Sequence, residues 1–196
     1  MSVILASKSS ARAAVLTGAG VRFETAAAPV DEAFEKVRLL AEGAGPREVA
    51  EALAVLKAQA IDAPPDALVI GADQTLDLDG ELFDKAESLA EARARLLQLR
   101  GRAHQLHAAV VAVKGRETVW RETATATLTM RDFSEAFLDA YLAEDGDQLL
   151  GSVGCYRLEG PGAQLFSKIE GDYFAILGLP LTGLLDLLRR EGELTA

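Results

Sequence analysis

The chain has 196 residues, is 49% hydrophobic and has a mean hydropathy of +0.14, so it can bury a sizeable core as one domain or as two closely packed lobes. Thirty acidic against twenty basic residues give a formal net charge of -10, which argues against a nucleic acid polymer but not against a small anion escorted by a divalent cation. One cysteine excludes an internal disulfide, and no secretory signal or apolar run of about 18 residues is present, so we expect a cytoplasmic protein without membrane contact.

The first residues predict a strand, a polar turn and a helix. Residues 3–6 are apolar, residues 7–10 are Ser-Lys-Ser-Ser, and residues 11–17 have helical character before a glycine. Ser9 or Ser10 is the expected N-cap, and a serine-rich turn at a helix start offers backbone N–H groups to an anion. Residues 1–23 also contain three basic residues and no acid. We therefore expect an anion site here, with an ordinary capped helix as the alternative.

Two helices are expected next, one capped by Asp31 and ending near Gly43, the other running from Pro46 to about residue 60. Lys57 lies on the flank of the second helix's apolar stripe, and the pattern favours an ammonium that reaches solvent over one that points into a cleft. The stripe itself consists of Val49, Leu53, Leu56 and Ala60.

The apolar run at residues 67–76 predicts a strand that is covered on both faces. We expect this strand to deliver Asp73 to its carboxyl end, where a carboxylate can act as a metal ligand or general base. An aspartate that merely opens the next turn is the alternative. The following Asp79-Gly80 pair predicts a tight hairpin, which would bring Lys85 back toward Asp73.

The remaining pattern predicts a mixed α/β protein without the regular alternation of a doubly wound fold. A capped helix is expected at 88–101, and two long strands at 103–113 and 117–130. His104 and His107 would face opposite sides of a strand, which makes them a poor metal pair. The other expected elements are a helix after residue 134, a glycine-bearing loop at 151–162 without P-loop spacing, strands at 165–169 and 173–177, and a helix from residue 180 with residues 181, 184, 185 and 188 inward.

Short motifs follow one another along almost the whole chain: residues 4–7 with Arg12, residues 30–32, Lys57-Ala58, 70–73, 78–81, Lys85, 170–173 and 178–180. In this order and spacing they resemble the Maf-like nucleotide pyrophosphatases. The resemblance implies one domain of residues 1–196, similar in fold to the inosine triphosphate pyrophosphatases, with two lobes around a mixed central sheet and a nucleotide cleft. It also implies a homodimer and hydrolysis of a nucleoside triphosphate to the monophosphate and pyrophosphate.

The same resemblance assigns roles to individual residues. Asp73 would accept the proton of the attacking water and, with Glu32, hold a divalent metal, Mg²⁺ or Mn²⁺. Such a metal would let acidic walls tolerate a triphosphate, and positive groups would neutralise charge on the phosphoryl oxygens. The residues expected to bind the triphosphate are Ser7, Ser9, Arg12, Lys57 and Lys85.

Three positions bear on the base: Ala11, Gln74 and Glu159. The branch of the family that resembles dTTP/UTP hydrolases has threonine and glutamine where this chain has Gln74 and Glu159, and both changes resemble the branch that acts on 7-methyl-GTP. A carboxylate such as Glu159 can accept hydrogen bonds from guanine donors and favours a cationic base. Ala11 matches neither the arginine of the pyrimidine branch nor the tryptophan of the methylguanine branch. We therefore favour 7-methyl-GTP, with dTTP or UTP as the alternative.

Two other classes remain open. Residues 77–81 superficially resemble the Asp-x-Asp-Gly-Thr loop of haloacid-dehalogenase-type phosphatases, although Glu81 stands where threonine is needed. Members of the Maf-like family often have a proline and further arginines after the first serine and a proline at position 86, all missing here. This departure leaves a nucleotide-binding regulator of cell division without turnover as the second alternative.

Overall fold

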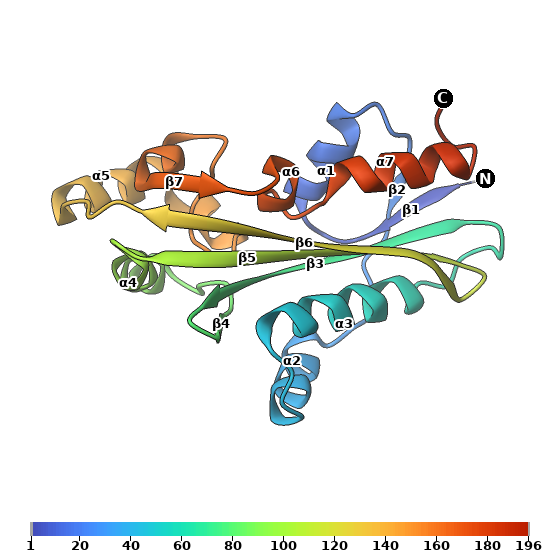
Figure 1. Ribbon diagram of the computed structural model, residues 1–196, viewed down its shortest axis with the longest axis horizontal. Helices are drawn as coiled ribbons and strands as arrows, with labels where there is room; N and C mark the ends of the chain where they lie inside the picture. The colour runs from blue at the N-terminus through green and yellow to red at the C-terminus, as the bar shows by residue number, and fades with distance from the viewer. Residues whose placement is uncertain (1, 196) are drawn as a thin grey trace.

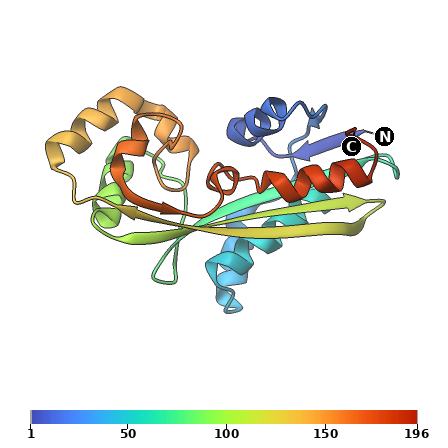
Figure 2. The same ribbon diagram turned by 45° about the horizontal axis from the view of Figure 1, so that its top comes forward.

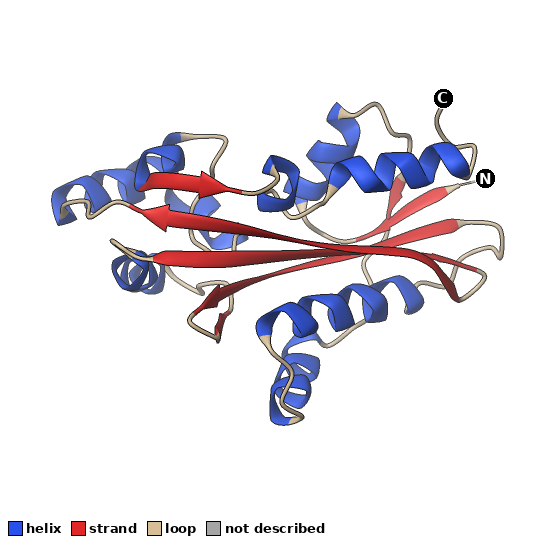
Figure 3. Ribbon diagram, viewed as in Figure 1, coloured by secondary structure: helices blue, strands red, loops and turns tan. Residues whose placement is uncertain are grey.

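The computed structural model describes residues 2–195 and shows an elongated α/β molecule built on one seven-stranded sheet (Figure 1, Figure 3). The strands are β1 (Val3–Ala6), β2 (Glu24–Thr25), β3 (Leu68–Leu78), β4 (Glu81–Phe83), β5 (Ala103–Lys114), β6 (Glu117–Met130) and β7 (Phe166–Glu170). Their order is β2-β1-β3-β5-β6-β7, with β4 paired to β3 off this path. Strand β1 runs parallel to β2 and β3, and the other pairs are antiparallel, so the predicted mixed α/β class is confirmed.

The helices cover both faces of the sheet. They are α1 (Ser10–Gly18), α2 (Glu32–Ala41), α3 (Pro46–Gln59), α4 (Leu89–Leu99), α5 (Glu135–Asp145), α6 (Tyr173–Ile176) and α7 (Leu181–Arg190), with two 3-10 turns, η1 (Gly146–Gly151) and η2 (Pro161–Leu165). The predicted N-caps at Ser9, Asp31, Ser88 and Ser134 are confirmed, because each of these side chains accepts a backbone N–H of the first turn.

Hydrophobic clusters at the two ends of the long strands produce two lobes. At one end α4, α5 and the 3-10 turns pack against one another and the sheet. At the other end α1 and α7 cover one face of the sheet and α3 covers the opposite face, as Figures 1 and 2 show. Helix α2 projects away from the body beyond α3, and three of its apolar side chains, Phe34, Val37 and Leu40, are exposed (Figure 1).

Two sequence predictions about local structure are wrong. Residues 173–177 form the short helix α6 and not a strand, because Asp172 accepts the N–H of Ala175 and caps a helical turn. In α7 the inward set includes Leu187, whereas Leu185 is only partly buried.

The buried face of α3 also differs from the prediction. It runs along Val49, Ala50, Leu53, Ala54, Lys57 and Ala58, whereas Leu56 and Ala60 are only partly buried. Its small residues Ala54 and Ala58 face β3, where they pack against Gly71. With this face toward the sheet, Lys57 lies within the buried face of α3 and not on its flank.

Candidate active site

The sequence predicted that Asp73 lies at the carboxyl end of its strand. In the structure Asp73 lies in the middle of β3. The strand continues to Leu78 because β5 pairs with it throughout and β4 adds a hairpin at its far end. On the side away from β5, however, β1 pairs only as far as Gly71 and β4 begins only at Leu76. In the described chain, residues 72–75 therefore have no strand partner on that side. This gap in the sheet lies beside Asp73, whose carboxylate contacts Lys57 of α3 and is only 7% exposed.

Close packing of α3 on β3 determines what faces Asp73. Gly71 makes this packing possible, since a Cβ atom there would lie 2.1 Å from the carbonyl oxygen of Ala54 and 2.7 Å from the nitrogen of Ala58. A larger residue would therefore force the helix away from the strand. With the helix this close, Lys57 reaches the carboxylate of Asp73.

Lys57 joins two carboxylates. Its Nζ lies 2.6 Å from Oδ1 of Asp73 and 2.8 Å from Oε2 of Glu32, and its side chain is only 7% exposed. The preference for an ammonium that reaches solvent is therefore wrong, because a buried carboxylate within reach of the lysine compensates the desolvation of the ammonium. Glu32 is the first residue of α2, and its side chain is 47% exposed.

The second oxygen of Asp73 is unsatisfied. Among residues 2–195, no hydrogen-bond partner reaches the buried Oδ2 atom. An unpaired buried carboxylate oxygen beside a second carboxylate fits a hard divalent cation such as Mg²⁺ or Mn²⁺. Because no group of three or more His, Cys, Asp or Glu side chains in the described part of the chain is arranged to hold a metal, most other ligands of such an ion would be water or substrate oxygens.

The N-terminal serine turn is organised around Arg12. Ser7 Oγ accepts hydrogen bonds from the backbone N–H of Ser9 and from Nη1 of Arg12, both at 3.2 Å, and Ser9 caps α1. Arg12 is buried, and its Nε donates to the carbonyl oxygen of Gly178 at 2.8 Å. Burial lowers the pKa of Arg12, while the charges of Asp73 and Glu32 act in the opposite direction. The guanidinium nevertheless stays charged, as arginine does in proteins.

Gly178, whose carbonyl oxygen accepts the hydrogen bond from Nε of Arg12, lies directly against the guanidinium. Its φ of +92° lies in the left-handed region, and a Cβ atom there would be 3.3 Å from Nε of Arg12. A glycine is therefore required by backbone conformation and by the close approach of the guanidinium. The sequence motif at residues 178–180 contained this residue without revealing its contact with Arg12.

Lys85 belongs to the same electrostatic cluster. Burial lowers its pKa first, and Arg12 and Lys57 lower it further, while Glu32 and Asp73 raise it. The preceding residue anchors the loop, because Asp84 pairs with Lys36 of α2 and its carbonyl accepts a hydrogen bond from Arg95. No motif pointed to Lys36 or Arg95, whose relevance depends on tertiary contacts alone.

The three positions expected to contact the base lie on different elements of the fold. Gln74 donates from Nε2 to the carbonyl oxygens of Ala175 and Ile176 at 2.9 and 3.0 Å, so it ties β3 to α6. Ala11 is exposed in the first turn of α1. Glu159 lies in the loop of the other lobe and is exposed, with its carboxylate 3.6 Å from Nε of Arg157. Glu159 is therefore not part of the cluster around Asp73.

Other polar groups that the sequence singled out have structural partners. His107 contacts Thr125 and Asp77, whereas His104 faces the other side of β5 and contacts Tyr156, as predicted. Asp77 also accepts the N–H of Gly80 and closes the β3–β4 hairpin. The aspartate of the phosphatase-like loop is therefore a turn residue.

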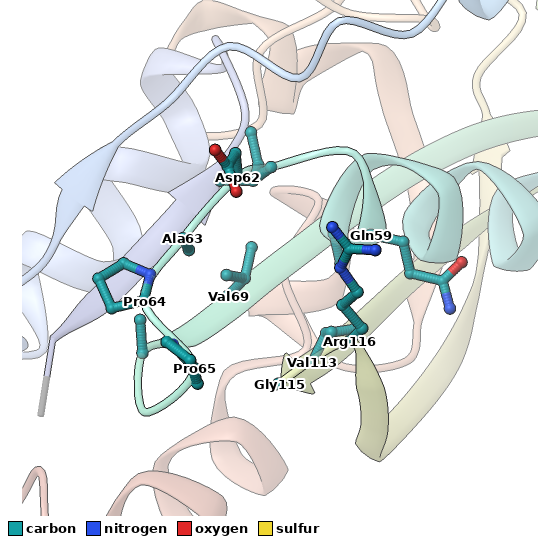
Figure 4. Close-up of a pocket in the computed structure, with 12 residues that line it drawn as sticks. Gln59, Asp62, Ala63, Pro64, Pro65, Val69, Val113, Gly115 and Arg116 are labelled. Carbon is teal, nitrogen blue, oxygen red and sulfur yellow. The ribbon is translucent and has the colours of Figure 1, made fainter.

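A cavity of about 390 Å³ lies elsewhere, near the start of β3 (Figure 4). Val69 and Val113, which pair across β3 and β5, line it together with Arg116 of the β5–β6 turn. Asp73 is four residues further along β3, roughly 13 Å at the usual rise of a strand. This cavity is separate from the cluster around Asp73.

None of the helices in residues 2–195 has both the length and the apolar character required to cross a lipid bilayer.

The fold and the cluster define an α/β protein that gathers carboxylates, cationic side chains and a serine turn beside a gap in its sheet, which are the groups expected of a polyphosphate-binding protein. Residues 2–191 match the family described as Maf-like protein, and the chain belongs to this family. The resemblance inferred from the motifs is confirmed.

Curated relatives align with the chain over almost its full length. A nucleoside triphosphate pyrophosphatase of Caulobacter vibrioides is 58% identical over 193 residues, which cover 98% of this chain and 97% of the relative. One of Granulibacter bethesdensis is 56% identical over 196 residues, covering 100% of both. A 7-methyl-GTP pyrophosphatase of Brucella abortus is 48% identical over 192 residues and covers 96% of both.

Proposed function

We propose that the chain hydrolyses a nucleoside triphosphate to the nucleoside monophosphate and pyrophosphate, as a hydrolase acting on acid anhydrides. The names of its full-length relatives support this activity. The observation that carries the proposal is the state of Asp73, which is buried with one oxygen on Lys57 and the other oxygen unpaired. A carboxylate held in this way has a fixed orientation and a free position for a proton.

In the proposed reaction, a water oxygen attacks the α-phosphorus and the bond between this phosphorus and the bridging α–β oxygen breaks. The carboxylate of Asp73 takes the proton from the water, and pyrophosphate leaves with the bridging oxygen. Arg12 and Lys85 neutralise the charge that develops on the phosphoryl oxygens, and the hydroxyl of Ser7 and the backbone of the serine turn orient the phosphates. Before metal and substrate bind, Lys57 holds Oδ1 and so fixes the orientation of the carboxylate.

A divalent cation, Mg²⁺ or Mn²⁺, would be held by Asp73 and Glu32 and would supply charge neutralisation and a more acidic bound water. The unpaired oxygen of Asp73 and the half-exposed carboxylate of Glu32 support this assignment.

We favour 7-methyl-GTP as substrate, with dTTP or UTP as the alternative. Since the amide nitrogen of Gln74 is occupied by α6, its Oε1 is the atom left to accept a hydrogen bond from a base. Guanine offers two donors on one edge, whereas uracil and thymine offer one imide N–H. Glu159 would supply a second acceptor only if the lobe that carries it approached the bound nucleotide.

The test is pyrophosphate release from 7-methyl-GTP, GTP, UTP, dTTP and CTP with Mg²⁺ or Mn²⁺. The wild type should release pyrophosphate, Asp73→Asn should not, and Asp77→Asn provides a matched control on the same strand. Nucleotide binding without Asp73-dependent release would instead indicate a regulator of cell division, and release of inorganic phosphate from monophosphate esters would indicate a phosphatase. Light scattering of the purified protein tests the expected homodimer.

A further inference from the structure

Lys57 contacts the same two carboxylates to which the proposed function assigns a metal ion. Its ammonium lies 2.6 Å from Asp73 and 2.8 Å from Glu32, which are the two carboxylates assigned to the divalent cation. Both Lys57 and Asp73 have side chains that are only 7% exposed, so this is an internal ion pair and not a surface contact. The same two carboxylates therefore face two possible cations.

These cations are competitors because they repel each other at short distance. An ammonium and a divalent ion that share two carboxylates in a poorly hydrated site disfavour each other's binding strongly. Each carboxylate gives one oxygen to Lys57, Oδ1 of Asp73 and Oε2 of Glu32, and keeps one oxygen that Lys57 does not contact. A divalent ion on the remaining oxygens would lie close to the ammonium, and their repulsion would weaken or break the contacts of Lys57.

One of the two carboxylates lies near the surface. Glu32 is 47% exposed and belongs to α2, a helix that projects from the body and whose residues are all exposed or half-buried (Figure 1). Lys57 has a long, flexible side chain that can swing while its backbone stays in α3. Arg12 and Lys85 lie in the same electrostatic cluster, so a released ammonium would join the groups available for a polyphosphate.

We infer that Lys57 is a built-in counter-cation that exchanges with the catalytic metal. Without metal it neutralises Asp73 and Glu32, and when the metal binds it leaves the carboxylates and becomes available to the phosphates. This inference rests on the proposed function, because the metal is the one proposed there. By linkage, a polyphosphate that engages Lys57 should raise the affinity for the metal.

The first experiment measures Mn²⁺ binding to the protein without nucleotide, from the electron paramagnetic resonance signal of free Mn²⁺. Lys57→Gln should bind Mn²⁺ more tightly than the wild type by on the order of tenfold or more, because it removes a cation in direct contact with both ligands. Lys85→Gln is the matched control, since it removes an equal charge from the same cluster and should change the affinity by only about two- to threefold. Lys57→Gln/Asp73→Asn should lose the gain.

The inference is overturned if Lys57→Gln binds Mn²⁺ no more tightly than the wild type, if it gains no more than Lys85→Gln, or if neither protein binds Mn²⁺. Binding by Lys57→Gln alone supports it. Removal of Lys57 leaves a buried carboxylate unpaired, which can make folding of this variant depend on Mn²⁺. A second measurement therefore uses the wild type.

The second measurement follows acetylation of individual lysines by an amine-reactive ester, with mass spectrometry as the readout. Saturating Mn²⁺ without nucleotide should accelerate acetylation of Lys57 several-fold. Lys168, whose side chain is 63% exposed and pairs with Glu170, serves as the internal reference and should not change. An unchanged or slower reaction at Lys57 overturns the exchange.

Neither measurement uses a nucleotide, so the two proposals fail separately. Loss of the exchange with intact pyrophosphate release would refute only the role of Lys57. An intact exchange in a protein that releases no pyrophosphate would refute only the proposed function.

Discussion

Asp73 and Asp77 lie four residues apart on the same face of β3, yet their surroundings differ completely. Asp77 uses both oxygens within the fold, one on the N–H of Gly80 at 2.6 Å and the other on Nε2 of His107 at 3.3 Å. Asp73 uses one oxygen on Lys57 and leaves the other unpaired. A carboxylate whose acceptors are satisfied supports structure, whereas one with a free buried acceptor is available for chemistry.

The difference arises from strand pairing and not from the residue itself. At Asp77 the neighbouring strand β4 is present, and its tight turn brings a backbone N–H to the carboxylate. At Asp73 neither β1 nor β4 reaches the strand within the described residues. Asp73 is also the more buried of the two, with 7% of its side chain exposed against 17% for Asp77, so its unpaired oxygen distinguishes it and not exposure to solvent.

The largest effect that tests this contrast is expected for Asp73→Asn. An amide cannot take the proton from water, so pyrophosphate release should fall by about 10³-fold, within the usual range for loss of a general base. The measurement is the steady-state rate of pyrophosphate release, with correct folding checked by circular dichroism. Activity within tenfold of the wild type would show that Asp73 is not the base.

Arg12→Lys should have the next largest effect. Lysine cannot reach both Ser7 Oγ and the carbonyl oxygen of Gly178 with a fixed planar fork, so kcat/KM should fall about 10- to 100-fold, as for the loss of one or two charge-assisted hydrogen bonds. The control is Arg22→Lys, an exposed arginine of the same N-terminal segment, which should leave kcat/KM unchanged. Equal effects of the two substitutions would remove Arg12 from the site.

Acid should destabilise the protein through His104. Burial lowers the pKa of His104 from 6.5 to about 4. Between these values the unfolded chain binds a proton that the folded chain does not, so stability is lost as the pH falls through this window, by about 2 kcal/mol at pH 4.5.

Urea unfolding at pH 7 and pH 4.5 measures this loss. His104→Gln, which can still bond the hydroxyl of Tyr156, should show a smaller difference between the two pH values than the wild type. An identical difference in both proteins would place the acid sensitivity elsewhere.

The smallest effect is expected for Asp77→Asn. The amide keeps an acceptor for Gly80 but loses the charge beside His107, so the free energy of unfolding should fall by about 1 kcal/mol. Urea unfolding measures this change, and pyrophosphate release should stay within about threefold of the wild type. A loss of activity as large as that of Asp73→Asn would contradict the division between the two aspartates.

Local features were predictable because neighbouring residues determine them. Ser9, Asp31, Ser88 and Ser134 cap helices through side chains that reach only the following turn. The Asp79-Gly80 turn was predictable for the same reason, since both residues adopt the positive φ that a tight hairpin needs.

Most of the wrong predictions concern contacts between distant segments, and only the turn of α6 also depends on a local cap. The orientation of Lys57 depends on how closely α3 approaches β3, and the position of Asp73 within its strand depends on where β1 stops. The helical turn of α6 is held by Asp172, a local cap, and by Gln74 from a strand about 100 residues earlier. The family motifs listed several of these residues together, but spacing along the chain could not reveal that Lys57 lies between Asp73 and Glu32.

Because Gly71 has no side chain, it determines the distance between Lys57 and Asp73. A methyl group there would meet the carbonyl oxygen of Ala54 at 2.1 Å, so the helix would have to rise by about 1 Å and carry the ammonium of Lys57 with it. The separation between α3 and β3 thus determines how strongly Lys57 interacts with Asp73. Substitutions at Ala54 and Ala58, which pack against Gly71, should therefore change whether Asp73 binds the ammonium of Lys57 or a metal more strongly.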